Sequence, residues 1–222
     1  MTTKQSGQDR SRIGIDESGK GDYFGPLVVA AAFVTPETEP DLRLMEVRDS
    51  KKISDNRILE MARDLRQVCP YSIVAIGPQR YNELYAKIRN LNRLLAWGHA
   101  RALENLLEKA DCHLAISDQF GDERYILNAL QEKGKRVRLV QRPKAESDLA
   151  VAAASILARA EFLTRLKRLS DEIGLPLPKG ASAQVELAAR MVVKKHGQEL
   201  LGTVAKLHFK TTQAVLAGPA DA

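Results

Sequence analysis

Residues 12–34 read RIGIDESGKGDYFGPLVVAAAFV, and the fold is predicted outward from this segment. Apolar residues alternate with others from Arg12 to Asp16, which is typical of a β-strand. Leu27 to Val34 is a nearly continuous apolar run, which indicates a second strand. Glycines lie between the two runs and favour a turn. The stretch therefore predicts two strands around a Gly-rich turn, in the manner of a hairpin.

Strands and helices follow one another along the rest of the chain. The apolar periodicity and the flanking turn residues predict a helix over 54–68, a strand over 71–76, a helix over 91–110, a strand over 113–117, a helix over 122–132, a strand over 136–141, and helices over 149–169 and 183–196. Residues 174–180 contain two prolines and are expected to form a surface loop. This order predicts an α/β fold with a mixed central sheet flanked by helices and a C-terminal helical region.

Length and composition limit the class of protein. A chain of 222 residues is long enough to bury a core, and we expect one domain over residues 12–212, a disordered tail over 1–11 and a flexible tail over 213–222. No apolar run approaches the roughly 18 residues of a membrane span. The polar first twelve residues lack the apolar stretch of a signal peptide. We therefore expect a cytoplasmic protein with no membrane partner, acting as a monomer.

Charge and cysteine content bear on the partner. The net charge of +6 is compatible with an acidic partner such as nucleic acid, although charge alone is weak evidence. Cys69 and Cys112 lie far apart and neither belongs to a CxxC motif, so the sequence supports neither a disulfide framework nor a structural zinc site.

Several acidic residues lie where a predicted strand ends or a helix begins. Asp16 and Glu17 end the first strand, Asp118 ends the strand over 113–117, and Glu146 and Asp148 precede the helix over 149–169. Strand ends of neighbouring strands meet at one sheet edge, where ligand sites of open α/β sheets form. Clustered carboxylates repel one another unless a cation lies between them. Mg²⁺ or Mn²⁺ suits oxygen ligands, and two such ions would support hydrolysis of a phosphodiester.

Each acid also has a simpler interpretation. Asp16 and Glu17 suit a solvated turn, and Asp118 suits a strand-ending turn or a helix cap. Glu146 and Asp148 suit the N-terminus of the following helix, where negative side chains are favoured. Spacing alone leaves these alternatives open.

Glycine and lysine residues next to the first acids suggest a phosphate contact. Gly19-Lys20-Gly21 is not a nucleotide-binding P-loop, because the spacer is too short and Gly21 replaces the required Ser or Thr. Glycines allow a backbone to approach nucleic acid closely, and Lys20 can meet a phosphate. The other candidate phosphate ligands are Lys51, Lys52 and Lys144, for which a solvated charge run is the alternative.

Residues 14–26, GIDESGKGDYFGP, resemble the signature of ribonucleases HII and HIII, and the DYFGP segment is closer to HIII. The resemblance continues to about residue 212 through these motifs: residues 49–52, 81–84, 90–92, 118–120, 144–146, 152–159 and 177–180. Such a series of ordered motifs is far more specific than any one Gly-rich turn.

The resemblance implies a ribonuclease H-like fold and an endonuclease that cuts the RNA strand of an RNA–DNA hybrid, leaving a 5′-phosphate and a 3′-hydroxyl. It implies two Mg²⁺ or Mn²⁺ ions held by Asp16, Glu17, Asp118 and Glu146, with Asp148 as the reserve for the fourth acid. It also implies that Gly19, Lys20 and Gly21 contact the hybrid, whose 2′-hydroxyl distinguishes RNA from DNA.

Two departures from the family pattern bear on the substrate. Bacterial HIII enzymes commonly carry an N-terminal substrate-binding domain, whereas about a dozen residues precede the first predicted strand here. Residues 179–182, KGAS, offer no tyrosine of the kind that reads an RNA–DNA junction in HII. We therefore expect better cleavage of long hybrids than of single embedded ribonucleotides. The alternatives are HII-type incision at single ribonucleotides and a non-catalytic hybrid-binding module.

Overall fold

The structure is a computed structural model that describes residues 10–48, 50 and 53–217. The chain divides into two compact units. The first unit comprises residues 1–17, 28–74 and 91–160, and the second comprises residues 18–27, 75–90 and 161–222. Both units are therefore assembled from segments that lie far apart in the sequence.

One mixed five-stranded sheet organises the fold, in the order β3-β2-β1-β4-β5. The strands are β1 (Arg12–Ser18), β2 (Leu27–Val34), β3 (Tyr71–Ile76), β4 (Leu114–Asp118) and β5 (Arg138–Arg142). β4 runs parallel to both of its neighbours, with Ser117 opposite Ile15 of β1 and Gln141 of β5. The strand that carries Asp16 thus lies beside the strand that ends in Asp118.

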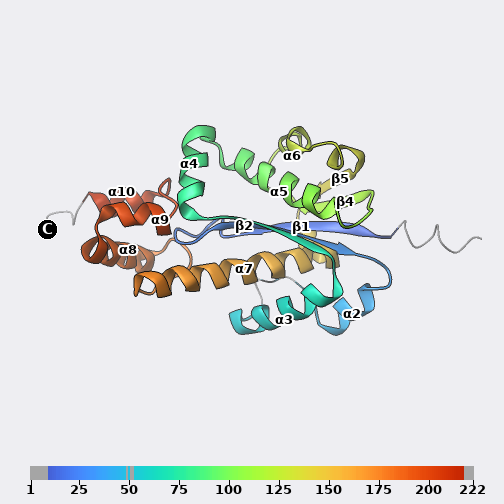
Figure 1. Cartoon of the computed structure of the whole chain (residues 1–222), viewed down its shortest axis with the longest axis horizontal. Coiled ribbons are helices and arrows are strands. Elements are labelled where there is room, and N and C mark those ends of the chain that lie inside the picture. The colour runs from blue at the N-terminus through green and yellow to red at the C-terminus, as the bar shows by residue number, and fades with distance from the viewer. Residues whose placement is uncertain (1–9, 49, 51–52, 218–222) are drawn as a thin grey trace, which may run out of the picture. The chain divides into compact units, whose positions relative to one another are not determined.

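Helices cover both faces of the sheet in the first unit (Figure 1). They are α2 (Glu39–Leu44), α3 (Asp55–Val68), α5 (Leu91–Leu107), α6 (Arg124–Ala129) and the first part of α7 (Leu149–Ile173), together with the 3₁₀ turns η2 (Gly134–Arg136) and η3 (Ala145–Ser147). The helices α5 and α6 lie over one face, and α3 and α7 lie over the other. Ser54 caps α3 by accepting a hydrogen bond from the Arg57 amide.

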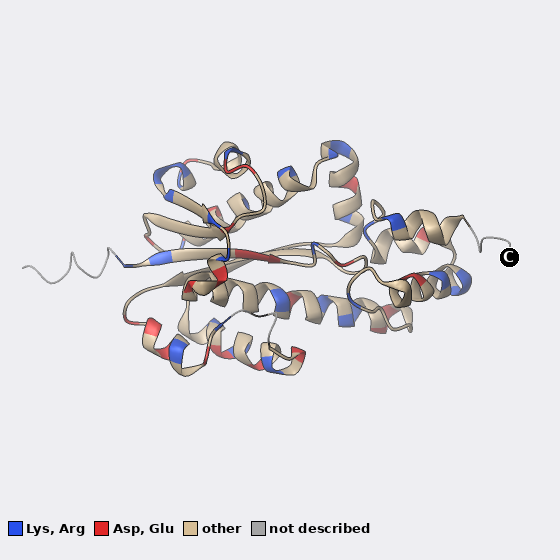
Figure 2. Ribbon diagram, turned by 180° about the vertical axis from the view of Figure 1, so that it is seen from behind, with Lys and Arg blue, Asp and Glu red and all other residues tan. Residues whose placement is uncertain are grey.

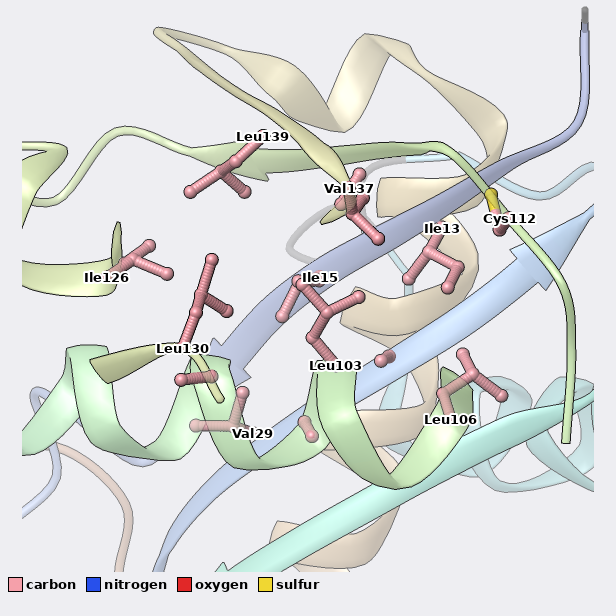
Figure 3. Close-up of a cluster of buried hydrophobic side chains, with 14 of the residues drawn as sticks. Ile13, Ile15, Val29, Leu103, Leu106, Cys112, Ile126, Leu130, Val137 and Leu139 are labelled. Atoms are coloured by element: carbon pink, nitrogen blue, oxygen red, sulfur yellow. The ribbon is translucent and has the colours of Figure 1, made fainter. Parts of the chain in front are cut away.

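The main core lies between the sheet and the helices α5 and α6 (Figure 3). Ile13 and Ile15 of β1 meet Leu103 and Leu106 of α5 there, and all four side chains are buried. On the opposite face of β1, a side chain at Gly14 would lie 2.0 Å from the carbonyl carbon of Ala150. The absence of a side chain therefore allows α7 to pack directly against the strand that carries the first candidate acids.

The second unit is mainly helical. Its helices are α4 (Pro78–Ile88), the remainder of α7, α8 (Ala183–His196), α9 (Leu201–Val204) and α10 (Lys210–Leu216), with the 3₁₀ turn η4 (Gln198–Leu200) before α9. Phe24, in the turn between β1 and β2, forms an isolated antiparallel bridge with Ala205 after α9. The C-terminal segment of this unit thus pairs with the Gly-rich turn that begins it.

The sequence predictions of the elements are largely confirmed. The predicted bounds of β2, β3 and α8 agree with the structure, and the predicted strand, helix and strand over 113–117, 122–132 and 136–141 appear as β4, a shorter α6 and β5. The helices α2 and α4 were not predicted. α10 reaches Leu216, inside the segment 213–222 for which a flexible tail was predicted. Among the described residues, no helix is long and apolar enough to cross a membrane.

Candidate active site

The sheet brings three of the predicted acids to one edge. Asp16 and Glu17 lie near the carboxyl end of β1, and Asp118 is the last residue of β4. Because β1 and β4 are parallel neighbours, their carboxyl ends meet at the same edge of the sheet. In Figure 2 an acidic segment stands out on a central strand of the sheet.

Asp16 interacts electrostatically with the other two acids. Burial raises the pKa of Asp16, the charges of Glu17 and Asp118 raise it further, and the resulting pKa is about 7. Hydrogen bonds from the Ser155 side chain and from the Glu17 amide oppose the shift. The Asp16 carboxyl group therefore shares a region of repulsive negative charge with two other carboxylates.

Hydrogen bonds fix the orientation of Asp16. The Glu17 amide donates to Asp16 Oδ1 over 2.8 Å. Ser155, on the α7 helix that packs against Gly14, bonds Asp16 and also lies 2.8 Å from the Ser50 hydroxyl. The serine pair thus joins the start of α7 to the segment that precedes α3.

Glu17 contacts a buried histidine of α5. His99 is fully buried, and its Nε2 atom lies 3.0 Å from Glu17 Oε2. Its Nδ1 atom lies 3.2 Å from the Ser117 hydroxyl of β4. In the tautomer with the proton on Nε2, His99 donates to Glu17. The imidazole ring therefore links the ends of both acid-bearing strands.

Asp118 connects the strand ends to the segment that carries the fourth acid. The Ala145 amide donates to Asp118 Oδ1 over 3.2 Å. Glu146 follows in the 3₁₀ turn η3, and its side chain is half-buried. It lines a hollow together with two basic residues, Arg48 and Lys144. Glu146 thus directly follows Ala145, whose amide bonds to Asp118.

Asp148, the reserve for the fourth acid, has structural partners. Both of its carboxylate oxygens accept hydrogen bonds from Arg12 Nε, over 2.9 and 2.8 Å. Oδ1 also accepts from the Ala150 amide in the first turn of α7. Asp148 therefore caps the helix and neutralises a largely buried arginine, which favours Glu146 over Asp148 for the fourth role.

The predicted substrate-binding residues fall into different parts of the chain. Gly19, Lys20 and Gly21 belong to the second unit. Lys144, in the first unit, is exposed and has a left-handed backbone with a φ of 56°. Lys51 and Lys52 lie outside the described residues.

Sequence reasoning missed two residues that hold the acids. No sequence pattern pointed to His99, because a histidine in an apolar helix gives no sign of what it will face. Ser155 lies inside the family motif over 152–159, but its spacing alone does not connect it with Asp16. The motif was the only available signal for Ser155, and His99 had none.

The arrangement of donors bears on metal binding. Within residues 10–48, 50 and 53–217, no three or more His, Cys, Asp or Glu side chains are grouped so that they could hold a metal ion. The donor chemistry nevertheless fits Mg²⁺ or Mn²⁺, because all the nearby candidates are carboxylates, and the mutual repulsion that raises the pKa of Asp16 would be relieved by a cation.

Comparisons with known proteins identify the family. The family model described as ribonuclease HII matches residues 13–212. Ribonuclease HIII of Protochlamydia amoebophila is 49% identical over 204 residues, which cover 92% of this chain and 68% of the relative. Ribonuclease HIII of Chlamydia pneumoniae is 45% identical, over 94% of this chain and 71% of the relative. The crystal structure of Bst ribonuclease HIII in complex with Mn²⁺ is 37% identical, with a TM-score of 0.88, over 96% of this chain and 71% of that one.

A helix-flanked mixed sheet with carboxylates at the ends of two parallel strands places the protein among the ribonuclease H-like enzymes. The chain belongs to the ribonuclease HII/HIII family, and its curated relatives carry the HIII name. The expectations of a ribonuclease H-like fold and of a ribonuclease H enzyme are confirmed.

Proposed function

We propose that this chain hydrolyses the RNA strand of RNA–DNA hybrids endonucleolytically, with Mg²⁺ or Mn²⁺, and leaves a 5′-phosphate and a 3′-hydroxyl. Asp16, Glu17, Asp118 and Glu146 are the proposed metal-binding acids. Gly19, Lys20 and Gly21 are the proposed hybrid contacts, and Lys51, Lys52 and Lys144 the proposed phosphate contacts.

One observation carries the proposal. Burial raises the pKa of Asp16, and the charges of Glu17 and Asp118, at the same edge of the sheet, raise it further. A protein that only bound nucleic acid would gain nothing from clustered negative charge beside phosphates. Such clustering suits an enzyme in which a cation offsets the repulsion, and the Mn²⁺ in the Bst ribonuclease HIII structure supports this assignment.

The bound metal would activate a water molecule and stabilise the charge that develops on the phosphate during displacement. The protein's own residues would orient the carboxylates. His99 restrains Glu17, and the Ser155 hydroxyl restrains Asp16. The Ala145 amide restrains Asp118. Restraint of this kind keeps the acids in place when no substrate is present.

The HIII-type substrate preference is the second part of the proposal. Lys179-Gly180-Ala181-Ser182 supplies no tyrosine for reading a junction. We therefore expect cleavage of continuous hybrids to exceed incision at a single ribonucleotide within a DNA duplex.

Two labelled duplexes test the proposal, a continuous RNA–DNA hybrid and a DNA duplex with one ribonucleotide, each with Mg²⁺ or Mn²⁺. Cleavage of the hybrid alone supports HIII-type activity. Equal cleavage of both duplexes would establish HII-type activity instead. Binding of the hybrid without cleavage, with either metal, would establish the non-catalytic module and refute the proposed function.

A further inference from the structure

A lysine side chain is fully buried in the second unit. Its position in the sequence is far from every candidate acid. Lys206 follows α9, and its side chain has no exposed surface. Its Nζ atom donates to the carbonyl oxygens of Asp22 over 2.6 Å, Gly25 over 2.8 Å and Phe24 over 3.4 Å. All three acceptors belong to the turn between β1 and β2, directly after Gly19-Lys20-Gly21.

The backbone around Lys206 holds the same turn. The Lys206 amide donates to the Tyr23 carbonyl over 2.8 Å, and the Gly25 amide donates to the Val204 carbonyl over 2.9 Å. These bonds form a short antiparallel pairing. The ammonium group therefore adds to the backbone hydrogen bonds that already hold the turn between β1 and β2.

The number of acceptors fits an ammonium group. An NH₃⁺ group has three donors, whereas a neutral amine has two. Burial lowers the pKa of Lys206 to about 7, and the charge of Asp22 opposes the shift. The face of the Tyr81 ring, whose centroid lies 5.8 Å from Nζ, adds a favourable contact for a cation.

A buried lysine is a costly way to stabilise a fold. An apolar side chain of similar volume would avoid the desolvation of the ammonium group. The cost is understandable if the lysine fixes one particular conformation of the turn. Backbone carbonyls are the groups that it holds, and a methionine or leucine side chain would leave them without these hydrogen bonds.

The hydrogen bonds around Lys206 continue into residues 19–22, which we call the recognition turn. The Asp22 amide donates to the Gly19 carbonyl over 3.3 Å, which closes the turn around Lys20 and Gly21. Asp22 Oδ1 also accepts from the Gly180 amide over 2.6 Å. Asp22 thus accepts a hydrogen bond from Lys206 at its carbonyl oxygen and donates one to the Gly19 carbonyl through its amide.

We infer that Lys206 is a positioning residue for hybrid recognition, which acts by fixing the Gly19–Gly21 turn in the conformation that meets the ribose of the RNA strand. This inference rests on the proposed function. It assigns to the C-terminal segment a role in telling RNA from DNA without any contact between Lys206 and the substrate.

The test compares Lys206→Met, Lys206→Gln and Lys194→Met. Methionine removes all the donors, whereas glutamine retains two. Lys194 is an exposed lysine of the same unit, so its variant controls for the lost charge. Fluorescence anisotropy without divalent metal gives the Kd for an RNA–DNA hybrid and for a DNA duplex of the same sequence. The readout is the ratio of the two Kd values, because a smaller folded fraction would weaken both affinities equally.

We expect Lys206→Met to reduce the preference for the hybrid by about tenfold, which corresponds to the loss of one or two net hydrogen bonds. Lys206→Gln should have an intermediate effect, and Lys194→Met should match the wild type. An unchanged ratio in a folded Lys206 variant would overturn the inference. So would failure of both variants to fold, since Lys206 would then serve stability. Wild-type protein that prefers the hybrid without cutting it would refute only the proposed catalysis.

Discussion

His99 Nε2 lies 3.0 Å from Glu17 Oε2, and the same imidazole ring contacts Ser117 through Nδ1. Glu17 lies near the end of β1, Ser117 lies near the end of β4, and His99 is buried on the helix that covers both strands. A residue that cannot reach substrate therefore fixes the position of a proposed metal-binding acid. Partners of this kind commonly orient metal ligands.

Replacing His99 should impair catalysis more than folding. We expect His99→Ala to lower the rate of hybrid cleavage about 10- to 100-fold, because Glu17 loses its orienting contact. His99→Gln keeps an amide donor and should retain more activity than the alanine variant. Initial rates and melting temperatures are to be measured together, with the exposed His113→Ala as the control. Equal activity of His99→Ala and His113→Ala would show that Glu17 needs no such restraint.

Much of the fold could be predicted because its elements carry strong local patterns. The apolar run over 27–34 is a central strand, and the Ser54 cap marks the start of α3. α4 was missed, although Gly77-Pro78 is a recognisable helix start with proline at the first helical position. α2 has only six residues, too few for its periodicity to be visible.

The candidate site was less predictable, because its contacts depend on strand neighbours. Asp118 meets the Ala145 amide because β5 runs parallel to β4 beside it. Both strands therefore end at the same edge of the sheet, and the segment that follows β5 lies next to Asp118. Which residue of α5 faces Glu17 depends on how that helix lies on the sheet. The family motifs supplied the acids, but the restraints on them required the three-dimensional structure.

Variants of the two candidate fourth acids should separate catalysis from stability. Glu146→Gln is expected to abolish cleavage at nearly unchanged stability. Asp148→Ala should retain cleavage but lower the free energy of unfolding by about 2 kcal/mol, because it removes a helix cap and one of the two carboxylates, Asp148 and Glu39, that pair with the largely buried Arg12. Chemical denaturation and cleavage assays measure the two effects. A stable but inactive Asp148→Asn variant would transfer the fourth role to Asp148.

Asp16→Asn and Asp118→Asn should abolish hybrid cleavage while the fold is retained. Both substitutions keep the shape of the side chain and remove the charge that a cation would require. Circular dichroism verifies folding, and the cleavage assay is repeated with Mg²⁺ and with Mn²⁺. Full activity of either variant with either metal would refute the site assignment.

The raised pKa of Asp16 predicts an unusual pH dependence of stability without metal. The folded protein holds the Asp16 proton up to a pKa of about 7, whereas an unfolded chain releases it near the ordinary aspartate value of 3.8. Between these values the folded state binds more protons, so its contribution to stability falls as the pH rises. Asp16→Asn should therefore raise the melting temperature in chelator at pH 8 more than at pH 4. Equal increases at both pH values would contradict the shift, and added Mg²⁺ should stabilise the wild type more than the variant.

The two glycines of the recognition turn should respond differently to alanine. Gly19 has a φ of 87°, and a side chain there would lie 2.2 Å from the Pro26 carbonyl oxygen, so Gly19→Ala should destabilise the protein. A side chain at Gly21 would meet no atom within 4 Å, so Gly21→Ala should fold normally. If the backbone at Gly21 approaches the ribose closely, its methyl group would nevertheless obstruct the hybrid. We therefore expect Gly21→Ala to keep the wild-type melting temperature and to bind the hybrid about tenfold more weakly, which corresponds to about 1.4 kcal/mol. Wild-type affinity of Gly21→Ala would show that the substrate does not pass close to this position.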